Sequence, residues 1–316
     1  MCGDREVPGE EAGGLWLTRF VRKSCPARVH IGMTAYNNEE TIHEAVSSIE
    51  VQTHQNWRMT LIDAGSSDGT WDICRDLARQ DTRIATFRQE QQTPWLLNAQ
   101  QHLLAADSPF FMLADADDRW SPNWVAANLT VVEERYLEAS FGRIEVMSAD
   151  SSDFEHVAAG RIVKGLDSRS RFLRQVRFSA VPEVLGKANL IYSLWRTTAL
   201  RDVFPWDLDR LHANRDLLFL VRALNRVRIG STPAATIHRR QGPSALMGMA
   251  DGLGRRKWTS LAFTLATAVP RTYPREYAEN TDGFATQVVV YGTVGTRVLV
   301  SGGIRAASSL IRVERQ

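Results

Sequence analysis

The chain has 316 residues, of which 44% are hydrophobic and 23% are charged, and its formal net charge is +2. Such a composition is typical of a globular protein with a substantial core and argues against an intrinsically disordered chain. The near-neutral charge gives no support for nucleic-acid binding, and we expect no nucleic-acid partner. The three cysteines show no C-x-x-C spacing, so neither a zinc site nor a disulfide framework is indicated.

The first segment, residues 1–27, is polar and acidic at its start, which is the opposite of a secretory signal, and we interpret it as a loose leader. No apolar run has the length of a membrane-spanning helix. The longest, residues 288–300, is interrupted by glycines and by Arg297. We therefore expect a cytoplasmic protein, with peripheral contact to the inner face of the membrane as an additional hypothesis.

Short apolar stretches alternate with amphipathic ones through the first 125 residues. Strands are predicted over 28–36, 83–87 and 109–114, and helices over 37–52 and 95–106. Between them, WRMTLIDAGSSDGT predicts a short apolar strand, a turn, and then a helix with Ile73, Cys74 and Leu77 on one face. The fourth strand is apolar throughout, as expected for a strand covered on both faces. This alternation predicts an α/β fold with a mostly parallel central sheet flanked by helices.

Two local features refine these helices. Asn37 and Glu40 resemble a capping box, which predicts that the first helix starts at Asn37. The third helix is expected to pack through its leucines, Leu96, Leu97, Leu103 and Leu104.

The pattern is less regular after Pro122. It predicts a helix over 123–139, short strands with turns over 141–160, a basic helix over 161–177, a helix over 214–224 and a short strand at 227–229. Residues 245–316 are expected to form helices and loops after a weak boundary near Gly242.

Two regions are rich in arginine and lysine, residues 161–177 and 245–316. The simpler interpretation of each is a solvated face or an ordinary helical appendage. The alternatives are contact with the phosphates of a substrate for the first region and with an anionic membrane for the second.

Polar clusters follow three of the predicted strands: TAYNNEE after the first, DAGSSDGT after the second and DADD after the fourth. Because ligands of open α/β sheets bind beyond the carboxyl ends of the strands, the three clusters predict one site. In an extended segment, Asp115 and Asp117 would project together, with α-carbons roughly 6.5–7 Å apart. Carboxylates suit Mg²⁺ or Mn²⁺, and Mg²⁺ completes its coordination with water and phosphates, so a nucleotide or diphosphate ligand is indicated.

The run RVHIGMTAYNNEETIHEAVSSIEVQTHQNWRMTLIDAGSSDGT, followed by FFMLADADDRWSP, resembles the family-2 glycosyltransferases of the GT-A fold. The resemblance is close over 28–125 and looser over 180–245. It implies an inverting transfer of a sugar from a nucleotide-sugar donor to an acceptor hydroxyl, assisted by Mg²⁺ or Mn²⁺. A UDP-sugar is the expected donor, and the resemblance leaves the acceptor unidentified.

The resemblance also implies roles for individual residues. Asp63 would read the base or ribose, Asp115 would contact the ribose, and Asp117 would hold the metal with support from Asp118. The donor-binding set that it implies is Thr34, Ala35, Tyr36, Glu39, Asp63, Asp115, Ala116 and Asp117. His238 would contact the metal or the phosphates, unless it is an ordinary histidine at a strand end.

The general base is expected near the start of a helix in HANRDLLFLVRAL. Matching Arg222 to the family makes Asp216 the base, whereas matching Asn225 puts Asn214 there, and an amide cannot accept the proton. We prefer Asp216, with a structural carboxylate at a helix start as its alternative role.

The resemblance divides the chain into a leader (1–27), a GT-A domain (28–244) and a helical C-terminal extension (245–316). Within the domain, 28–125 would form the nucleotide-sugar half and 126–244 the acceptor half.

Three departures from the family pattern leave a rival open: Ala64 follows Asp63, Arg215 replaces a glutamate, and Ala99-Gln100-Gln101-His102 replaces Arg-Asn-x-Gly. The rival is a non-catalytic relative that binds nucleotide-sugars. A nucleotidylyltransferase or a dinucleotide oxidoreductase would need glycines after the first strand, and TAYNNEE has none.

Overall fold

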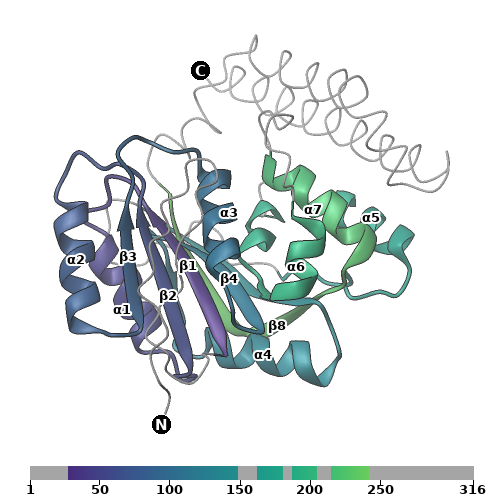
Figure 1. The fold of residues 1–316 in the computed structure, drawn as a ribbon. Helices are drawn as coiled ribbons and strands as arrows, with labels where there is room; N and C mark the ends of the chain where they lie inside the picture. Colours follow the sequence, from purple (N-terminus) through teal and green to yellow (C-terminus); the bar gives the residue numbers. More distant parts are fainter. Residues whose placement is uncertain (1–27, 149–161, 181–186, 205–214, 242–316) are drawn as a thin grey trace, which may run out of the picture.

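The structure is a computed structural model that describes residues 28–148, 162–180, 187–204 and 215–241 (Figure 1). The predicted leader and C-terminal extension lie outside these ranges, as does part of the segment predicted as short strands over 141–160. The described helices include none that is both long and apolar enough to cross a bilayer.

The first half alternates strands and helices as the sequence predicts. Its elements are β1 (Val29–Ala35), α1 (Ile42–Glu50), β2 (Trp57–Asp63), α2 (Thr70–Gln80), β3 (Ile84–Arg88), α3 (Trp95–Ala105) and β4 (Phe110–Asp115). The second half contains β5 (Arg119–Trp120), α4 (Trp124–Glu134), β6 (Ala139–Ser148), α5 (Arg171–Ala180), the 3₁₀ helix η2 (Lys187–Tyr192), β7 (Leu194–Arg196), α6 (Thr197–Val203), α7 (Arg215–Arg226) and β8 (Ile229–Gln241).

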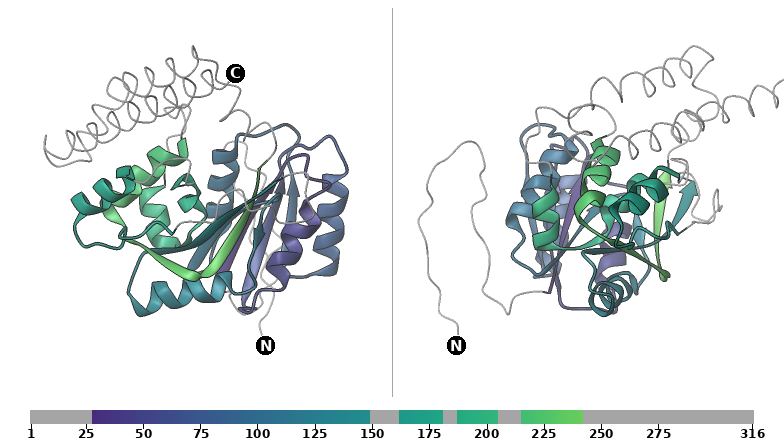
Figure 2. Two further views of the ribbon diagram at one scale, coloured as in Figure 1. Left: turned by 180° about the vertical axis from the view of Figure 1, so that it is seen from behind. Right: turned by 90° about the vertical axis from the view of Figure 1, so that its right-hand side faces the viewer.

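All eight described strands join one sheet in the order β3-β2-β1-β4-β7-β6-β8-β5. The first four are parallel, whereas β7 is antiparallel to both β4 and β6, and β5 to β8. The step from β3 to β4 returns across the sheet, so right-handed connections place α3 on the face opposite α1 and α2 (Figures 1 and 2). The α/β fold predicted from the sequence is confirmed.

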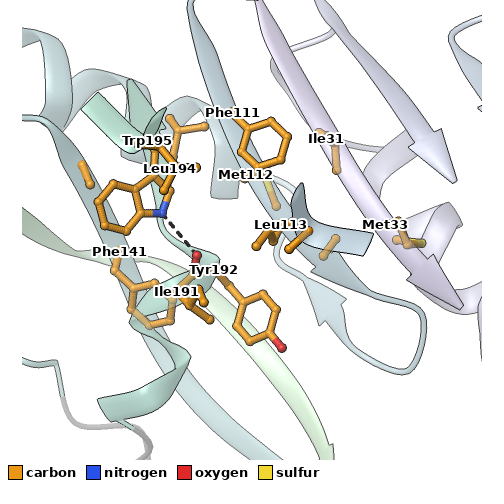
Figure 3. Packing of buried hydrophobic residues seen from close by; sticks show 14 of the residues in the cluster. Ile31, Met33, Phe111, Met112, Leu113, Phe141, Ile191, Tyr192, Leu194 and Trp195 are labelled. Carbon is orange, nitrogen blue, oxygen red and sulfur yellow. Dashed lines mark hydrogen bonds between the residues drawn. The ribbon is translucent and has the colours of Figure 1, made fainter. Parts of the chain in front are cut away.

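One hydrophobic core runs through both halves. Phe111 and Leu113 of β4 lie beside Trp195 of β7 and Tyr192 of η2 (Figure 3). The Trp195 ring is fully buried, and its Nε1 donates to the carbonyl of Ile191 at 3.2 Å, which satisfies the only polar atom of the side chain. This shared packing connects η2 and β7 to the strand that carries the aspartates.

The predicted capping box is wrong. The helix begins at Ile42, five residues after Asn37, and its N-cap residue Thr41 makes no side-chain capping bond. Asn37 instead has a positive φ of 53°, a conformation that asparagine tolerates, and its Oδ1 accepts from the backbone N–H of Ser67 at 3.0 Å. The side chain therefore ties the loop after β1 to the loop after β2.

The predicted packing face of the third helix is partly wrong. Leu96 and Leu103 are buried, but Leu97 and Leu104 are exposed. Their places against the sheet are taken by two polar residues, Asn98 and His102, together with Ala99. A leucine pattern alone therefore misplaced the buried face by part of a turn.

The second half is more regular than the sequence indicates. A single strand, β6, starts at Ala139, and β8 extends for 13 residues. Pro233 hides β8 in the sequence, but the β6–β8 register shifts between Phe141 and Arg143, so this proline falls in the irregular part of the ladder. The basic helix predicted over 161–177 begins only at Arg171, after a turn in which Gly165 has a φ of +81°.

A buried polar chain crosses the sheet beneath α3. His30 Nε2 lies 3.0 Å from Thr60 Oγ1, which lies 2.7 Å from His102 Nδ1, and His102 Nε2 lies 3.2 Å from Thr34 Oγ1. The His102 ring fits because Gly32 has no side chain, since a Cβ there would lie 2.6 Å from the His102 Cβ. Burial lowers the pKa of both His30 and His102 to about 3, so both rings are neutral.

Because His30 and His102 are buried as neutral rings, we expect the folded protein to lose stability at acidic pH. Between pH 6.5 and pH 3 the two histidines bind protons in the unfolded chain but not in the folded chain. The contribution of the neutral rings to the free energy of unfolding is therefore fully present above the unfolded pKa and is lost as the pH falls below it. The free energy of unfolding should drop by about 2 kcal/mol between pH 6.5 and 5.5 from the two rings together. Urea unfolding of His102→Gln should show about half of this loss, and His43→Gln, on the exposed face of α1, should show all of it. An equal pH dependence in all three proteins would contradict the prediction. The comparison between variants cancels the contributions of the carboxylates.

Candidate active site

The register of the parallel strands brings the predicted site residues to one edge of the sheet. Ala35, the last residue of β1, is paired with Asp63 of β2, and Thr34 is paired with Asp115 of β4. Because neighbouring parallel strands lie about 4.8 Å apart, residues that are far apart in the sequence, such as Thr34 and Asp115, meet there. The carboxyl edge of β1, β2 and β4 is the candidate site.

Asp115, Asp117 and Asp118 are gathered by a turn at this edge. The segment Asp115–Asp118, the aspartate turn, is closed by the Asp118 N–H, which donates to the Asp115 carbonyl at 3.4 Å. One carboxylate oxygen from each of the three aspartates lies within 4.8 Å of the other two. The extended segment predicted from the sequence is therefore wrong, because a turn brings all three carboxylates together and not only those of Asp115 and Asp117.

The electrostatics of the aspartate turn favour a bound cation. Burial, and then the charge of Asp115, raise the pKa of Asp117 above its ordinary value. Burial also raises the pKa of Asp118, whose Oδ2 is buried and has no hydrogen-bond donor among the described residues. A buried carboxylate oxygen without a donor, facing two other carboxylates, fits a hard divalent cation with oxygen ligands. The residues present therefore suit Mg²⁺ or Mn²⁺.

Two residues of the second half complete the surroundings of the aspartate turn. The hydroxyl of Tyr192, in η2, donates to Asp115 Oδ2 at 2.5 Å. Arg239, in β8, lies with its NH1 3.4 Å from the same oxygen and its Nε 3.2 Å from Asp118 Oδ2. Neither Tyr192 nor Arg239 is indicated by the sequence motifs, which point only to the neighbouring His238.

A second group of charges lies beside the aspartate turn. Glu44 of α1 accepts from Arg119 and, at 2.6 Å, from Arg240 NH2. The backbone N–H of Arg240 also donates to Asp118 Oδ1 at 3.1 Å. These contacts attach β8 to α1 and hold Asp118 at its position.

The predicted nucleoside side of the site contains both anchored and exposed groups. Thr34 is held by His102, as described above, whereas Tyr36 is 40% exposed. Asp63 is fully buried: its Oδ1 accepts from the N–H and hydroxyl of Ser66, and its Oδ2 lies 3.3 Å from Arg88 Nε. Asp63 therefore organises the loop after β2 in this structure.

The remaining predicted donor-binding residues connect the loops around the site, Glu39 through its side chain and Ala35 and Ala116 through their backbone carbonyls. Glu39 is exposed and its Oε2 accepts from the Gly69 N–H at 2.7 Å, which joins the loops after β1 and β2. Ala35 is buried and its carbonyl accepts from the Ala64 N–H at 2.8 Å. The Ala116 carbonyl accepts from the hydroxyl of Thr41 at 2.9 Å, so the aspartate turn is also fixed to the start of α1.

His238 is not part of the group of metal-ligating atoms among the described residues. It is paired with Glu145 in the β6–β8 ladder, and its Nδ1 lies 3.2 Å from the Glu145 carboxylate. Since neighbouring residues of a strand point to opposite faces, Arg239 and not His238 is directed at Asp115 and Asp118.

Asp216 is the second residue of α7, and the position of its side chain lies outside the described part of the structure. Helix α7 packs against η2, the element that carries Tyr192. The structure therefore places the helix predicted to carry the base next to the element that contacts Asp115.

The basic run over 161–177 is partly structural. Arg174 is buried, and its guanidinium donates to the carbonyls of Leu224 and Ser168 at 2.8 and 2.7 Å. Arg177 NH1 donates to the Gly165 carbonyl at 3.0 Å. These two arginines donate to backbone carbonyls, including one near the end of α7, so part of the basic run stabilises the fold.

Proteins of known family resemble this chain in sequence. The profile of the family described as "Glycosyl transferase family 2" matches residues 30–183. The putative teichuronic acid biosynthesis glycosyltransferase TuaG of Bacillus subtilis is 27% identical over 121 residues, which are 38% of this chain and 48% of TuaG. The Escherichia coli protein described as UDP-Glc:alpha-D-GlcNAc-diphosphoundecaprenol beta-1,3-glucosyltransferase WfgD is 28% identical over 134 residues, 42% of this chain and 52% of WfgD. The chain thus matches about half the length of these relatives.

Solved structures share the fold. S. aureus TarS, residues 1–349, superimposes with a TM-score of 0.52 at 16% identity, covering 86% of this chain and 82% of that chain. GalNAc-T7, crystallised with UDP, GalNAc and Mn²⁺, gives a TM-score of 0.53 at 10% identity, over 68% of this chain and 44% of that chain. At these identities the similarity establishes a common architecture.

Proposed function

Because the chain belongs to glycosyl transferase family 2 through residues 30–183, we propose that it transfers a sugar from a nucleoside diphosphate donor to an acceptor hydroxyl. The observation that carries this proposal is the aspartate turn at the carboxyl edge of β1, β2 and β4, with three carboxylate oxygens within 4.8 Å of one another. A diphosphate approaches such a group only when a cation neutralises it.

Asp117 and Asp118 would hold the divalent cation, with Asp115 beside it. A bound Mg²⁺ or Mn²⁺ supplies positive charge for the diphosphate that leaves with the bonding electrons. Thr34, Tyr36 and Asp63, at the same edge, would line the nucleoside side. UDP is the proposed nucleotide because TarS has been crystallised with UDP-GlcNAc, with a TM-score of 0.50 to this chain, and because WfgD is described as using UDP-Glc.

The proposed reaction is a single displacement with inversion. The acceptor oxygen forms a bond to the anomeric carbon while the bond from that carbon to the diphosphate oxygen breaks. The acceptor proton passes to a carboxylate, for which Asp216 is the proposed base. We propose the domain organisation expected from the sequence: a GT-A domain over 28–244, with the acceptor half from residue 126 onward.

Binding and hydrolysis of nucleotide-sugars test the proposal. With Mn²⁺, the correct donor at 100 times its Kd should stabilise the folded protein by about 2.7 kcal/mol, which raises Tm by roughly 5 °C. UDP-Glc, UDP-GlcNAc and GDP- and TDP-sugars form the panel, and EDTA should remove the shift. Release of free sugar from the donor, with water as acceptor, should accompany binding.

Two outcomes would count against the proposal. No shift with any nucleotide-sugar in the presence of metal would refute donor binding. A metal-dependent shift without hydrolysis or transfer to any hydroxyl would favour the non-catalytic nucleotide-sugar-binding relative, to which Ala64 and Arg215 point.

A further inference from the structure

Arg239 lies against the same carboxylates that would hold a divalent cation. Its guanidinium contacts Asp115 Oδ2 and Asp118 Oδ2 at 3.4 and 3.2 Å, and it lies 5.0 Å from the centre of the Tyr192 ring. Its side chain is only 20% exposed. The Arg239 guanidinium therefore directly compensates part of the negative charge of the aspartate turn, through two of its three carboxylates.

We propose that Arg239 and the divalent cation compete for the aspartate turn, so that Arg239 sets the metal affinity of the site. The inference rests on the proposed function only in taking the aspartate turn as the metal site. It assigns to Arg239 a role that opposes metal binding, although the residue contacts two aspartates of the proposed donor site.

The competition follows from the charges. Asp118 Oδ2 has no hydrogen-bond donor among the described residues and is compensated by the ion pair with Arg239. A cation bound through Asp117 and Asp118 would meet the guanidinium against the same oxygen, and like charges at this separation repel strongly where water is excluded. A metal bound at Asp118 Oδ2 therefore works against the ion pair between this oxygen and Arg239.

Displacement requires only a movement of the side chain. The backbone of Arg239 is held in β8, where it is paired with Val146 of β6. A guanidinium that leaves the carboxylates has its fork of N–H groups free for a phosphate, which it can bind through two parallel hydrogen bonds. Arg239 should therefore weaken binding of the metal alone and strengthen binding of the metal together with a diphosphate.

The neighbouring Arg240 provides a matched control. Its NH2 is 2.6 Å from Glu44, and within the aspartate turn its side chain reaches only the backbone carbonyl of Asp117, at 3.4 Å. Its contact with Asp118 is made by the backbone N–H, which every substitution except proline retains. Arg239→Gln and Arg240→Gln thus remove the same charge from adjacent residues, and only the first removes a guanidinium that directly contacts carboxylates of the aspartate turn.

The experiment measures binding of Mn²⁺ alone, by calorimetry and by the metal-induced rise in Tm, and then binding of UDP at saturating Mn²⁺. Arg239→Gln should bind Mn²⁺ at least tenfold more tightly than the wild type, and its Tm should rise more on adding metal. Arg240→Gln should stay within threefold of the wild type. UDP affinity at saturating Mn²⁺ should fall at least tenfold in Arg239→Gln. Arg239→Lys keeps the positive charge but loses the planar pair of N–H donors. Its affinity for Mn²⁺ should lie between those of the wild type and of Arg239→Gln.

The inference is overturned if Arg239→Gln binds Mn²⁺ no more tightly than Arg240→Gln, or if no variant binds Mn²⁺. Should Arg239→Gln fail to fold without metal, the same comparison between Arg239→Lys and Arg240→Lys decides. Tighter Mn²⁺ binding by Arg239→Gln without UDP binding by any protein would support the competition and refute the proposed function, so the two failures are distinguishable.

Discussion

Asp117→Asn should reduce sugar transfer by on the order of 10³-fold or more and should abolish metal-dependent binding of UDP. The substitution keeps the shape of the side chain but removes a carboxylate that would hold the cation, and a metal supplies several kcal/mol of charge stabilisation in the transition state. Transfer from the best donor of the panel and calorimetry with UDP and Mn²⁺ measure the two effects.

The same substitution should not weaken the fold. The pKa of Asp117 is raised by burial and by the charge of Asp115, which means that its ionised form is disfavoured in the folded protein. Replacing it with an amide removes this repulsion, so Tm without metal should stay the same or rise. Glu134→Gln, which removes an exposed carboxylate from α4, is the control and should leave transfer and UDP binding unchanged. Undiminished, metal-dependent UDP binding by Asp117→Asn would show that the metal is held elsewhere.

Asp216→Asn should slow transfer by on the order of 10²–10⁴-fold, because a general base that is lost typically costs that much. The affinity for the donor should change little, since the base would contact the acceptor hydroxyl and not the diphosphate. Turnover at saturating donor and acceptor, together with UDP affinity, separates the two effects. If Asp216 were only a structural carboxylate at the start of α7, Asp216→Asn would lower the free energy of unfolding by about 1 kcal/mol or less. Tm would then fall without a selective loss of turnover.

Glu134→Gln, the exposed carboxylate of α4 used above, is also a suitable control for this measurement, because it lies outside the segment 202–216 that is predicted to carry the base. Near-normal turnover of Asp216→Asn would mean that the register based on Arg222 is wrong and would direct attention to Asp207 and Asp209. If every acid over 202–216 is dispensable, the non-catalytic relative becomes the better interpretation.

The sequence by itself determined the first half of the fold and the position of the aspartates. The apolar stretches became β1 to β4, because runs of buried β-branched and aromatic residues separated by helical spacing leave few other arrangements. Asp63 and Asp115 could be assigned to one site because parallel strands carry their carboxyl ends to the same edge, and the register of Ala35 with Asp63 and of Thr34 with Asp115 agrees.

Local patterns were less reliable where a residue found a distant partner. Asn37 has the chemistry of a helix cap, but in the structure its side chain accepts from the Ser67 N–H in another loop. His102 occupies a helix face where leucines were expected, because Gly32 leaves space for its ring and because Thr34 and Thr60 satisfy both ring nitrogens. No spacing along the chain reveals such pairs.

The tertiary structure alone decided which residues surround the aspartate turn. Tyr192 is 77 positions from Asp115 and Arg239 is 124 positions away, and both reach it only because β7, β6 and β8 extend the parallel sheet beyond β4. The choice between His238 and Arg239 depended on which face of β8 is directed at Asp118, and the alternation of the strand settles that only once its pairing with β6 is known. Composition and motifs specify the chemistry a segment can perform, whereas burial and long-range pairing determine which side chains are close enough to perform it together.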